Sequence, residues 1–293
     1  MSHPSNSNSL ALYERDADRF VPTRLARGPW HNDSQHGGPV QGLLARCVQE
    51  HPSERPMQVV RFTCDLWRAA AFEPLTVSVR TLRDGKAAEW LEAELRHGDQ
   101  VAARATALRL REEDVPATPD STPHPLGDLE DASSPIRWLG TSGERDEITD
   151  FVNAIELRPV EDFIRPAAWL RLRVPLVAGE DTTPFVAAAT LCDMVYGLPI
   201  VRDVQRGNPI VAAQPFVAIN VDTSLQFHRS PRGEWIGFDA EVRYGPHGAG
   251  LGRAALCDED GALGYAQQSL LLRDKQAPPA WESRLRRDAE EVG

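Results

Sequence analysis

The stretch GGPVQGLLARCV, residues 37–48, has a counterpart in TTPFVAAATLCD, residues 182–193. Each stretch begins with two small or helix-capping residues, continues with a proline and then becomes largely apolar. This is the pattern with which a buried helix begins. Two positions also match in residue type at the same offset of 145 residues, Pro39 with Pro184 and Cys47 with Cys192. The chain is therefore predicted to contain two copies of one unit, each with a central apolar helix.

Further matches follow downstream in the same order. CDLWRAAAFEPLTVSVRTLRDG aligns with LQFHRSPRGEWIGFDAEVRYGP, which sets Arg68 over Arg229. ARATALRLR aligns with YAQQSLLLR, which sets Thr106 over Gln268. The offset has grown to 161 or 162 residues, so the second copy carries about sixteen additional residues after its helix. Matches in one order and with similar spacing indicate a tandem duplication.

Alternating segments accompany each predicted helix. Runs such as LTVSVRTLR, AEWLEAELRHG and WIGFDAEVRYG alternate apolar and polar residues, as half-buried strands do. Asp-Gly and Gly-Asp pairs at 84–85, 98–99 and 260–261 supply hairpin turns. A helix with an antiparallel meander predicts a curved sheet wrapped around that helix, and two copies side by side cover each other's open edges. The predicted fold class is α+β, a double hotdog of two tandem hotdog units, each with a central helix wrapped by an antiparallel sheet.

Changes in composition predict where the units end. Residues 112–145 hold many acidic groups, several prolines and little hydrophobic periodicity, which marks a linker or a long surface excursion. We therefore predict an N-terminal hotdog unit over residues 1–111, a linker over 112–145, a C-terminal hotdog unit over 146–275 and a tail over 276–293.

Bulk composition argues against several function classes. The net charge of −11 disfavours nucleic acid as a partner, because phosphate backbones are bound through clustered Lys and Arg. An anionic small ligand needs only a local basic pocket and is not excluded. No window approaches about 18 consecutive apolar residues, so no membrane span is predicted. The polar N-terminus lacks the apolar core of a signal peptide, which predicts a cytoplasmic protein.

Familiar catalytic and metal-binding motifs are missing from the sequence. The four cysteines form no CxxC pair and have no histidine at metal-ligand spacing, so we expect buried, small hydrophobic side chains rather than a zinc site. No GxSxG elbow, P-loop or dinucleotide-binding GxGxxG is found. A serine hydrolase, a nucleotide hydrolase and a hydride-transferring enzyme are therefore disfavoured.

Asp193 is the first candidate for a functional side chain. It follows Ala189 by four residues and Phe185 by eight, so it shares their helix face, and the first copy holds Val48 at this position. Burial against the sheet would raise the pKa of the carboxyl and make it a better general base. The alternative is a frayed last turn that exposes the side chain to solvent.

Two other places hold candidate polar groups. Gln267 and Gln268 are adjacent on an alternating strand, so one of the two amides faces inward and needs hydrogen-bond partners. In the loop before the first helix, backbone N–H groups of Gly37 and Gly38 could hold a developing oxyanion, and His36 precedes them in the same substrate-binding loop. A flexible capping loop is the alternative reading of this segment. The neighbouring Asp33 and His36 share a loop, and their spacing there does not predict the geometry of a catalytic dyad.

Over residues 20–273 the chain resembles the type II acyl-CoA thioesterase family. Seven fragments carry the resemblance: HGGPVQGLLARC, RTLRDGKAAEWLEAEL, IELRPVED, AAWLRLRVPLV, LCDMVYGLPIV, VDTSLQFHR and AQQSLLLR. The resemblance implies hydrolysis of acyl-CoA by a water nucleophile, without a metal, a cofactor or a covalent intermediate. The family site combines an Asp at the end of the second helix, a Thr on the following strand and a Gln on the last strand. These positions fall on Asp193, Asn220 and Gln268. Asn220 departs from the family's threonine, but its amide still donates and accepts hydrogen bonds.

We therefore predict hydrolysis of an acyl-CoA thioester. Asp193 is the expected general base, Asn220 and Gln268 would orient the water, and N–H groups near Gly37 and Gly38 would stabilise the oxyanion. Two alternatives stay open: a non-catalytic protein that binds acyl-CoA or a fatty acyl group, and a hotdog relative such as an enoyl-CoA hydratase. Because hotdog units cover their sheets by pairing, a homo-oligomer is also predicted.

Overall fold

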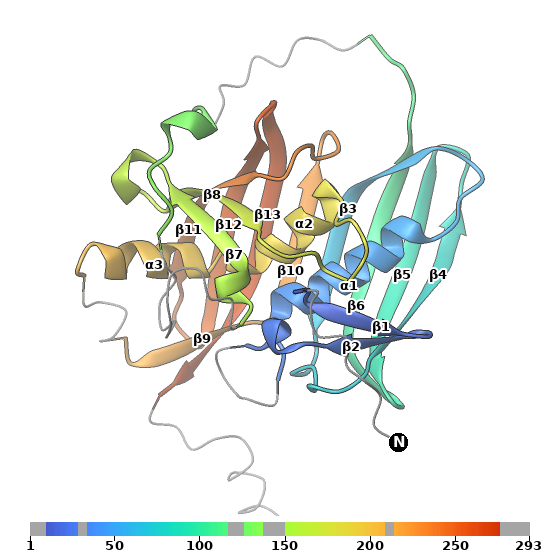
Figure 1. The fold of residues 1–293 in the computed structure, drawn as a ribbon, viewed down its shortest axis with the longest axis horizontal. Coiled ribbons are helices and arrows are strands. Elements are labelled where there is room, and N and C mark those ends of the chain that lie inside the picture. The colour runs from blue at the N-terminus through green and yellow to red at the C-terminus, as the bar shows by residue number, and fades with distance from the viewer. Residues whose placement is uncertain (1–9, 29–33, 117–125, 137–149, 209–213, 276–293) are drawn as a thin grey trace, which may run out of the picture.

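The computed structural model describes residues 10–28, 34–116, 126–136, 150–208 and 214–275 (Figure 1). This part of the chain forms one large sheet of eleven strands and a separate two-stranded hairpin. The order in the large sheet is β4-β5-β6-β3-β10-β13-β12-β11-β8-β7, and β9 pairs with β13 off this path. Strands of the first unit therefore lie in one half of the sheet and those of the second unit in the other.

The first unit supplies the hairpin β1 (Tyr13–Asp16) and β2 (Arg19–Pro22), then helix α1 (Gly37–Glu50) and strands β3 (Met57–Leu66), β4 (Thr76–Asp84), β5 (Ala88–His97) and β6 (Gln100–Arg111). The second unit supplies β7 (Ile155–Pro159) and β8 (Ala167–Leu172), then helices α2 (Pro184–Leu191) and α3 (Gly197–Gln205). It continues with strands β9 (Phe216–Asn220), β10 (Asp222–Phe227), β11 (Ile236–Tyr244), β12 (Ala249–Asp258) and β13 (Gly261–Asp274). Among its short 3₁₀ turns, Cys192–Met194 joins α2 to α3.

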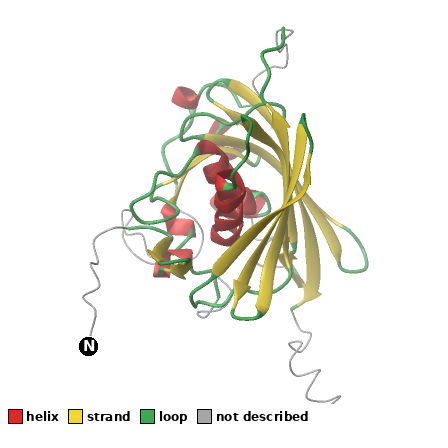
Figure 2. Ribbon diagram, turned by 90° about the vertical axis from the view of Figure 1, so that its right-hand side faces the viewer, coloured by secondary structure: helices red, strands yellow, loops and turns green. Residues whose placement is uncertain are grey.

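Helices α1 and α2 lie against each other on the concave side of the curved sheet (Figure 2). The buried face of α1 includes Leu43, Leu44 and Val48, which recur at helical spacing. At Gly42 a side-chain methyl would collide with Thr190 of α2, so the glycine lets the two helices approach closely. The predicted central helices are thus the core around which both halves of the sheet curve.

The two units join where β3 pairs with β10, close to a pseudo-twofold axis. Thr63 lies opposite Ser224 in this antiparallel pair, and their hydroxyl oxygens are 3.1 Å apart. These two residues are equivalent at the offset of 161 residues, so each unit contributes the same position to the centre of the junction. The predicted duplication is confirmed, and so is the predicted α+β double hotdog.

The strand register corrects one of the sequence matches. The residue at the junction pairs with Thr106 of β6 in the first unit and with Gln267 of β13 in the second. Thr106 is therefore equivalent to Gln267, and the alignment that set it over Gln268 is wrong by one residue. Because neighbouring residues on a strand point to opposite faces, the true counterpart of Gln268 is the fully buried Ala107.

The predicted hairpin turns are confirmed, since 84–85, 98–99 and 260–261 fall at the junctions β4–β5, β5–β6 and β12–β13. Gly98 has a φ of 54° and Gly261 a φ of 119°, which suit a residue without a side chain.

Part of the predicted linker packs on the second unit. Leu126 is buried in a small apolar cluster with Trp169 and Trp235. Residues 117–125 and 137–149 lie outside the described residues, as does the predicted tail 276–293. The unit boundaries at 111, 145 and 275 stay predictions.

No single helix in the described ranges is both long and apolar enough to cross a membrane. The segments Pro184–Met194 and Gly197–Gln205 pass that criterion only as a pair, bent by 60°.

Candidate active site

Polar side chains from both units meet at the N-terminal end of α1. The first unit contributes His36 and Gln41, and the second unit contributes Asp193, Asn220, Thr223 and Gln268. Asp193, Gln41, Thr223 and Gln268 are buried in this cluster. The structure thus brings together the three residues predicted to be catalytic and places them beside the predicted substrate-binding loop.

Asp193 lies in the 3₁₀ turn Cys192–Met194 that follows α2, and only 8% of the residue is exposed. Its Oδ2 is 2.6 Å from Nδ1 of His36. Its Oδ1 accepts hydrogen bonds from Nδ2 of Asn220 at 2.6 Å and from Nε2 of Gln41 at 3.4 Å. The alternative of a frayed, solvent-exposed last turn is therefore wrong.

The pKa of the Asp193 carboxyl lies below its usual value. Burial by itself raises this pKa. His36 favours the ionised form through its charge when its ring is protonated and through its hydrogen bond, and together with hydrogen bonds from Asn220 and Gly38 it outweighs burial. Burial raises the pKa as expected, but the expected net rise is wrong, because the polar surroundings of the carboxylate outweigh burial. The carboxylate is consequently ionised at neutral pH.

Of the two predicted loop glycines, Gly38 contacts the Asp193 carboxylate and Gly37 leaves no room for a side chain beside it. The Gly38 N–H donates to the carboxylate. The Gly38 nitrogen also lies 3.4 Å from Nδ1 of His36. Because Nδ1 donates its own proton to Asp193, it cannot accept a hydrogen bond from Gly38. A Cβ on Gly37 would lie 2.8 Å from Oδ2 and 3.0 Å from Oδ1 of Asp193. Within the described residues the Gly37 N–H has no acceptor, so it remains available at the positive end of α1.

Gly37→Ala is expected to lower kcat for the reaction of this site while changing thermal stability little. The added methyl pushes on the two carboxylate oxygens of Asp193, and a displacement of that kind misaligns the cluster. The matched control is Gly42→Ala, whose methyl meets Thr190 at the crossing of α1 and α2, so that about 1–3 kcal/mol of stability is lost by overpacking. Steady-state kinetics and thermal melts of both variants check the two patterns, and an unchanged kcat in Gly37→Ala would contradict the first.

The loop that carries His36 is fixed by hydrogen bonds to distant segments. The side chain of Gln35 accepts from the Tyr13 hydroxyl at 2.6 Å and donates to the Ala71 carbonyl at 2.6 Å. The His36 N–H donates to the Ala26 carbonyl, and its ring packs on Phe151 with 4.7 Å between ring centroids. His36 is the N-cap residue of α1, so this segment does cap the helix, as the alternative reading expected. Asp33 lies outside the described residues, and the carboxylate that His36 contacts belongs to Asp193.

The two predicted amides have different partners. Asn220, at the end of β9, donates to Asp193 and also to the Thr223 hydroxyl oxygen at 3.2 Å. Gln268 accepts from the Tyr196 N–H at 2.9 Å and donates to the Cys192 carbonyl at 3.1 Å and the Asp193 carbonyl at 3.3 Å. Its amide therefore ties β13 to the turn that carries Asp193. The prediction that one of the two adjacent glutamines faces inward is confirmed, since Gln268 is buried and its neighbour is exposed.

Two residues of the cluster were missed in the sequence. Gln41 donates to Asp193 and, at 2.9 Å, to the hydroxyl oxygen of Thr223, and both side chains are fully buried. A glutamine between the apolar Val40 and Leu43 is the signal for Gln41. For Thr223 the signal is alternation along its strand, which turns it inward together with Leu225.

The cysteines contribute no thiolate to the cluster. Burial raises the pKa of the Cys64 thiol well above its usual value, and the charges of Asp65, Asp193 and Asp222 add to this effect. Burial, followed by Asp193, does the same for Cys192. Cys64, Cys192 and Cys257 are buried, as predicted for small hydrophobic side chains, whereas Cys47 is only half-buried. Among the described residues no group of three or more His, Cys, Asp or Glu side chains is arranged to hold a metal ion.

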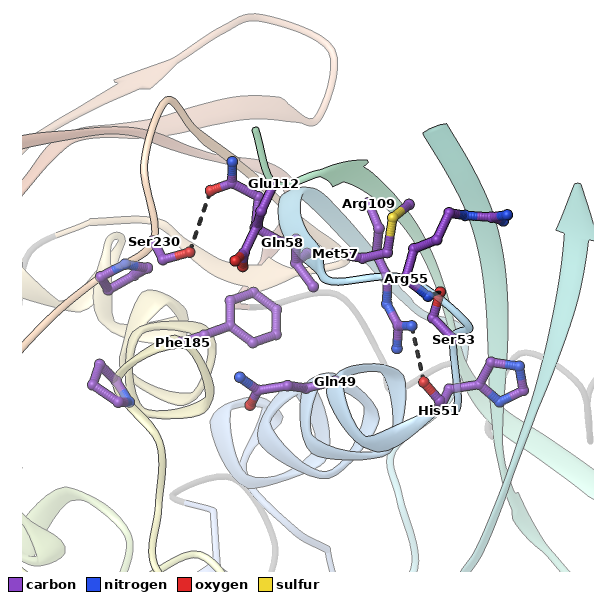
Figure 3. Close-up of a pocket in the computed structure, with 13 residues that line it drawn as sticks. Gln49, His51, Ser53, Arg55, Met57, Gln58, Arg109, Glu112, Phe185 and Ser230 are labelled. Carbon is purple, nitrogen blue, oxygen red and sulfur yellow. Dashed lines mark hydrogen bonds between the residues drawn. The ribbon is translucent and has the colours of Figure 1, made fainter. Parts of the chain in front are cut away.

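The pseudo-twofold axis relates this cluster to a second place at the other end of the two helices. The counterparts of the three predicted catalytic residues are apolar there: Val48, Val59 and Ala107. A cavity of about 320 Å³ opens at this end, and Figure 3 shows Phe185 and Gln49 among the side chains that line it. The polar cluster is therefore present at one of the two related places in the described structure.

Two family models match the sequence. The N-terminal domain of acyl-CoA thioesterases matches residues 26–110, and the C-terminal domain matches residues 127–272. No protein with a curated description matches the chain significantly.

Several solved structures share the fold. A putative thioesterase from Novosphingobium aromaticivorans superposes with a TM-score of 0.65 at 19% identity and covers 90% of this chain and 100% of that chain. A protein of unknown function with a hot dog fold from Alicyclobacillus acidocaldarius reaches 0.64 at 16% identity, over 91% of this chain and 96% of that chain. The acyl-CoA thioesterase II TesB2 from Mycobacterium marinum reaches 0.59 at 18% identity, over the same two shares. At these identities the likeness shows the fold, whereas the two domain models together span most of the sequence. The chain belongs to the acyl-CoA thioesterase family.

Proposed function

We propose that this protein hydrolyses acyl-CoA thioesters at the Asp193 cluster. The observation that carries the proposal is a buried, ionised carboxylate held by donors from both units beside unpaired polar atoms. Oε1 of Gln41 and Oδ1 of Asn220 are buried and have no hydrogen-bond partner among the described residues. Buried carbonyl oxygens of this kind accept hydrogen bonds from water. They support a bound water next to Asp193.

The other cluster residues take supporting roles in this proposal. The Gly37 N–H, at the N-terminus of α1, polarises the thioester carbonyl and stabilises the oxyanion that forms on attack. The Gly38 N–H and Asn220 hold the carboxylate of Asp193. Gln268 positions the turn that carries this carboxylate rather than touching the water, because both ends of its amide already bind backbone and hydroxyl groups.

A panel of saturated acyl-CoAs from short to long provides the test, with thiol release as the readout. We expect release of free CoA thiol with a preference for part of the panel. Binding of acyl-CoA without thiol release would contradict hydrolysis and favour the acyl-binding alternative.

Hydration of an enoyl-CoA is a second candidate, favoured by the contact between His36 and Asp193. A histidine held by a carboxylate can take a proton from water for addition to a double bond as well as for attack on a carbonyl. An enoyl-CoA in the same panel separates the two reactions. Hydration adds the mass of one water and leaves the thioester intact, whereas hydrolysis releases the thiol.

Asn220→Ala is expected to lower kcat by roughly 10- to 100-fold, since a hydrogen bond to a charged group contributes about 1.5–3 kcal/mol. Asn220→Thr is the matched variant, because a hydroxyl can still donate to Oδ1 of Asp193, and we expect it to stay within a few-fold of wild type. Initial rates at saturating acyl-CoA check both. Equal rates for Asn220→Ala and wild type would remove Asn220 from the proposed site.

A further inference from the structure

Hydrogen-bond donors surround the Asp193 carboxylate. His36, Asn220, Gln41 and the Gly38 N–H all donate to its two oxygens. The donors of His36 and Asn220, each at 2.6 Å, occupy one position on each oxygen, and Gln41 at 3.4 Å and the Gly38 N–H approach the remaining positions. The side chain is also only 5% exposed. A buried carboxylate surrounded by donors in this way is poorly placed to take a proton from a water molecule.

His36, in contrast, keeps one ring nitrogen without a hydrogen-bond partner among the described residues. Its Nδ1 lies 2.6 Å from an ionised carboxylate, which has no proton to give, so Nδ1 carries the shared proton. In the neutral ring this leaves Nε2 as a bare acceptor on the far side of the imidazole. No hydrogen bond reaches Nε2 from the described residues, and 13% of the side chain is exposed. Contact with Phe151 holds the plane of the ring.

We propose that Nε2 of His36 is the proton acceptor of the reaction and that Asp193 is a positioning residue. The assignment rests on the proposed hydrolysis of acyl-CoA. A water O–H gives its proton to Nε2 while the water oxygen forms a bond to the thioester carbonyl carbon. The resulting oxyanion collapses, the C–S bond breaks, and the imidazolium returns the proton to the leaving sulfur. The products are a carboxylic acid and the free CoA thiol, and His36 is neutral again.

Asp193 supports both halves of this cycle. Its hydrogen bond to Nδ1 selects the tautomer with a bare Nε2 and fixes the direction of the ring. Its negative charge stabilises the imidazolium between the two proton transfers. The pair spans the two units, since His36 precedes α1 and Asp193 follows α2. At the counterpart positions, Asp181 and Val48, no such pair can form.

His36→Asn separates a catalytic role from a structural one. Asparagine is a favoured helix N-cap and can still donate an N–H to Asp193, but it lacks a basic acceptor. We expect kcat to fall about 10²- to 10⁴-fold, the usual contribution of a general base, while the Kd of a non-hydrolysable thioether analogue of acyl-CoA changes little. His36→Gln serves as a second variant if the first does not fold. Asp181→Asn, at the counterpart position, is the control and should match wild type.

Chemical rescue distinguishes a catalytic role of His36 from a structural one. In His36→Ala the space left by the ring can admit imidazole, and we expect added imidazole to restore part of kcat in a concentration-dependent way. Asp193→Asn should not respond to imidazole. Loss of activity in His36→Asn without rescue of His36→Ala would assign His36 a structural role and overturn the proposal. A kcat of His36→Asn within a few-fold of wild type would also overturn the proposal and would make Asp193 the proton acceptor. Absence of thiol release from wild type is a different outcome, because it removes the proposed function itself.

Discussion

Asp193→Ala is expected to abolish nearly all thioester hydrolysis, with kcat reduced at least about 10³-fold. The substitution removes the anion to which His36, Asn220 and the Gly38 N–H all point. The imidazole of His36 then loses both its preferred tautomer and the charge that stabilises its protonated form. Thiol release at saturating acyl-CoA measures the loss, and circular dichroism with a thermal melt shows that the variant is folded.

A matched aspartate shows whether the effect is specific. Asp203 lies on α3, ten residues further along, and its carboxylate pairs with the neighbouring Arg202. Asp203→Ala should retain wild-type kcat. Substantial thiol release by folded Asp193→Ala would exclude Asp193 from the chemistry and with it the proposed site.

Gln268→Ala is expected to be the most destabilising of these variants and to lower kcat as well. Its amide satisfies the Tyr196 N–H and the Cys192 carbonyl, and each buried group left unpaired costs about 1–3 kcal/mol. The same change frees the turn that carries Asp193, so the carboxylate no longer holds its place. Urea denaturation gives the change in the free energy of unfolding, and thiol release gives the change in kcat.

The adjacent glutamine provides the control for this prediction. Gln267 is exposed on the opposite face of β13, so Gln267→Ala should change stability by no more than about 0.5 kcal/mol and leave kcat unchanged. Similar losses for the two variants would mean that the buried hydrogen bonds of Gln268 do not carry its effect.

Much of the architecture could be predicted because local sequence patterns specify it and each pattern occurs twice. Pro39 and Pro184 mark the starts of two equivalent helices, and alternating apolar residues mark the strands that curve around them. Asp193 could be selected as a candidate because its counterpart is Val48. The equivalence of positions on β6 and β13 could not be predicted to the exact residue. An alignment shifted by one residue matches the two short strand sequences almost equally well.

The cluster around Asp193 required the tertiary structure. Gln41 is 152 residues from Asp193 and 182 residues from Thr223 along the chain, and yet it hydrogen-bonds both. Periodicity shows which face of a helix or strand is buried, but it does not show which side chain of the other unit lies opposite. The sequence by itself therefore determined the duplication, the central helices and the acid at the end of the second one. Only the tertiary structure decided that His36 meets this acid, because a hydrogen bond acts over about 3 Å and depends on where two distant segments are finally placed.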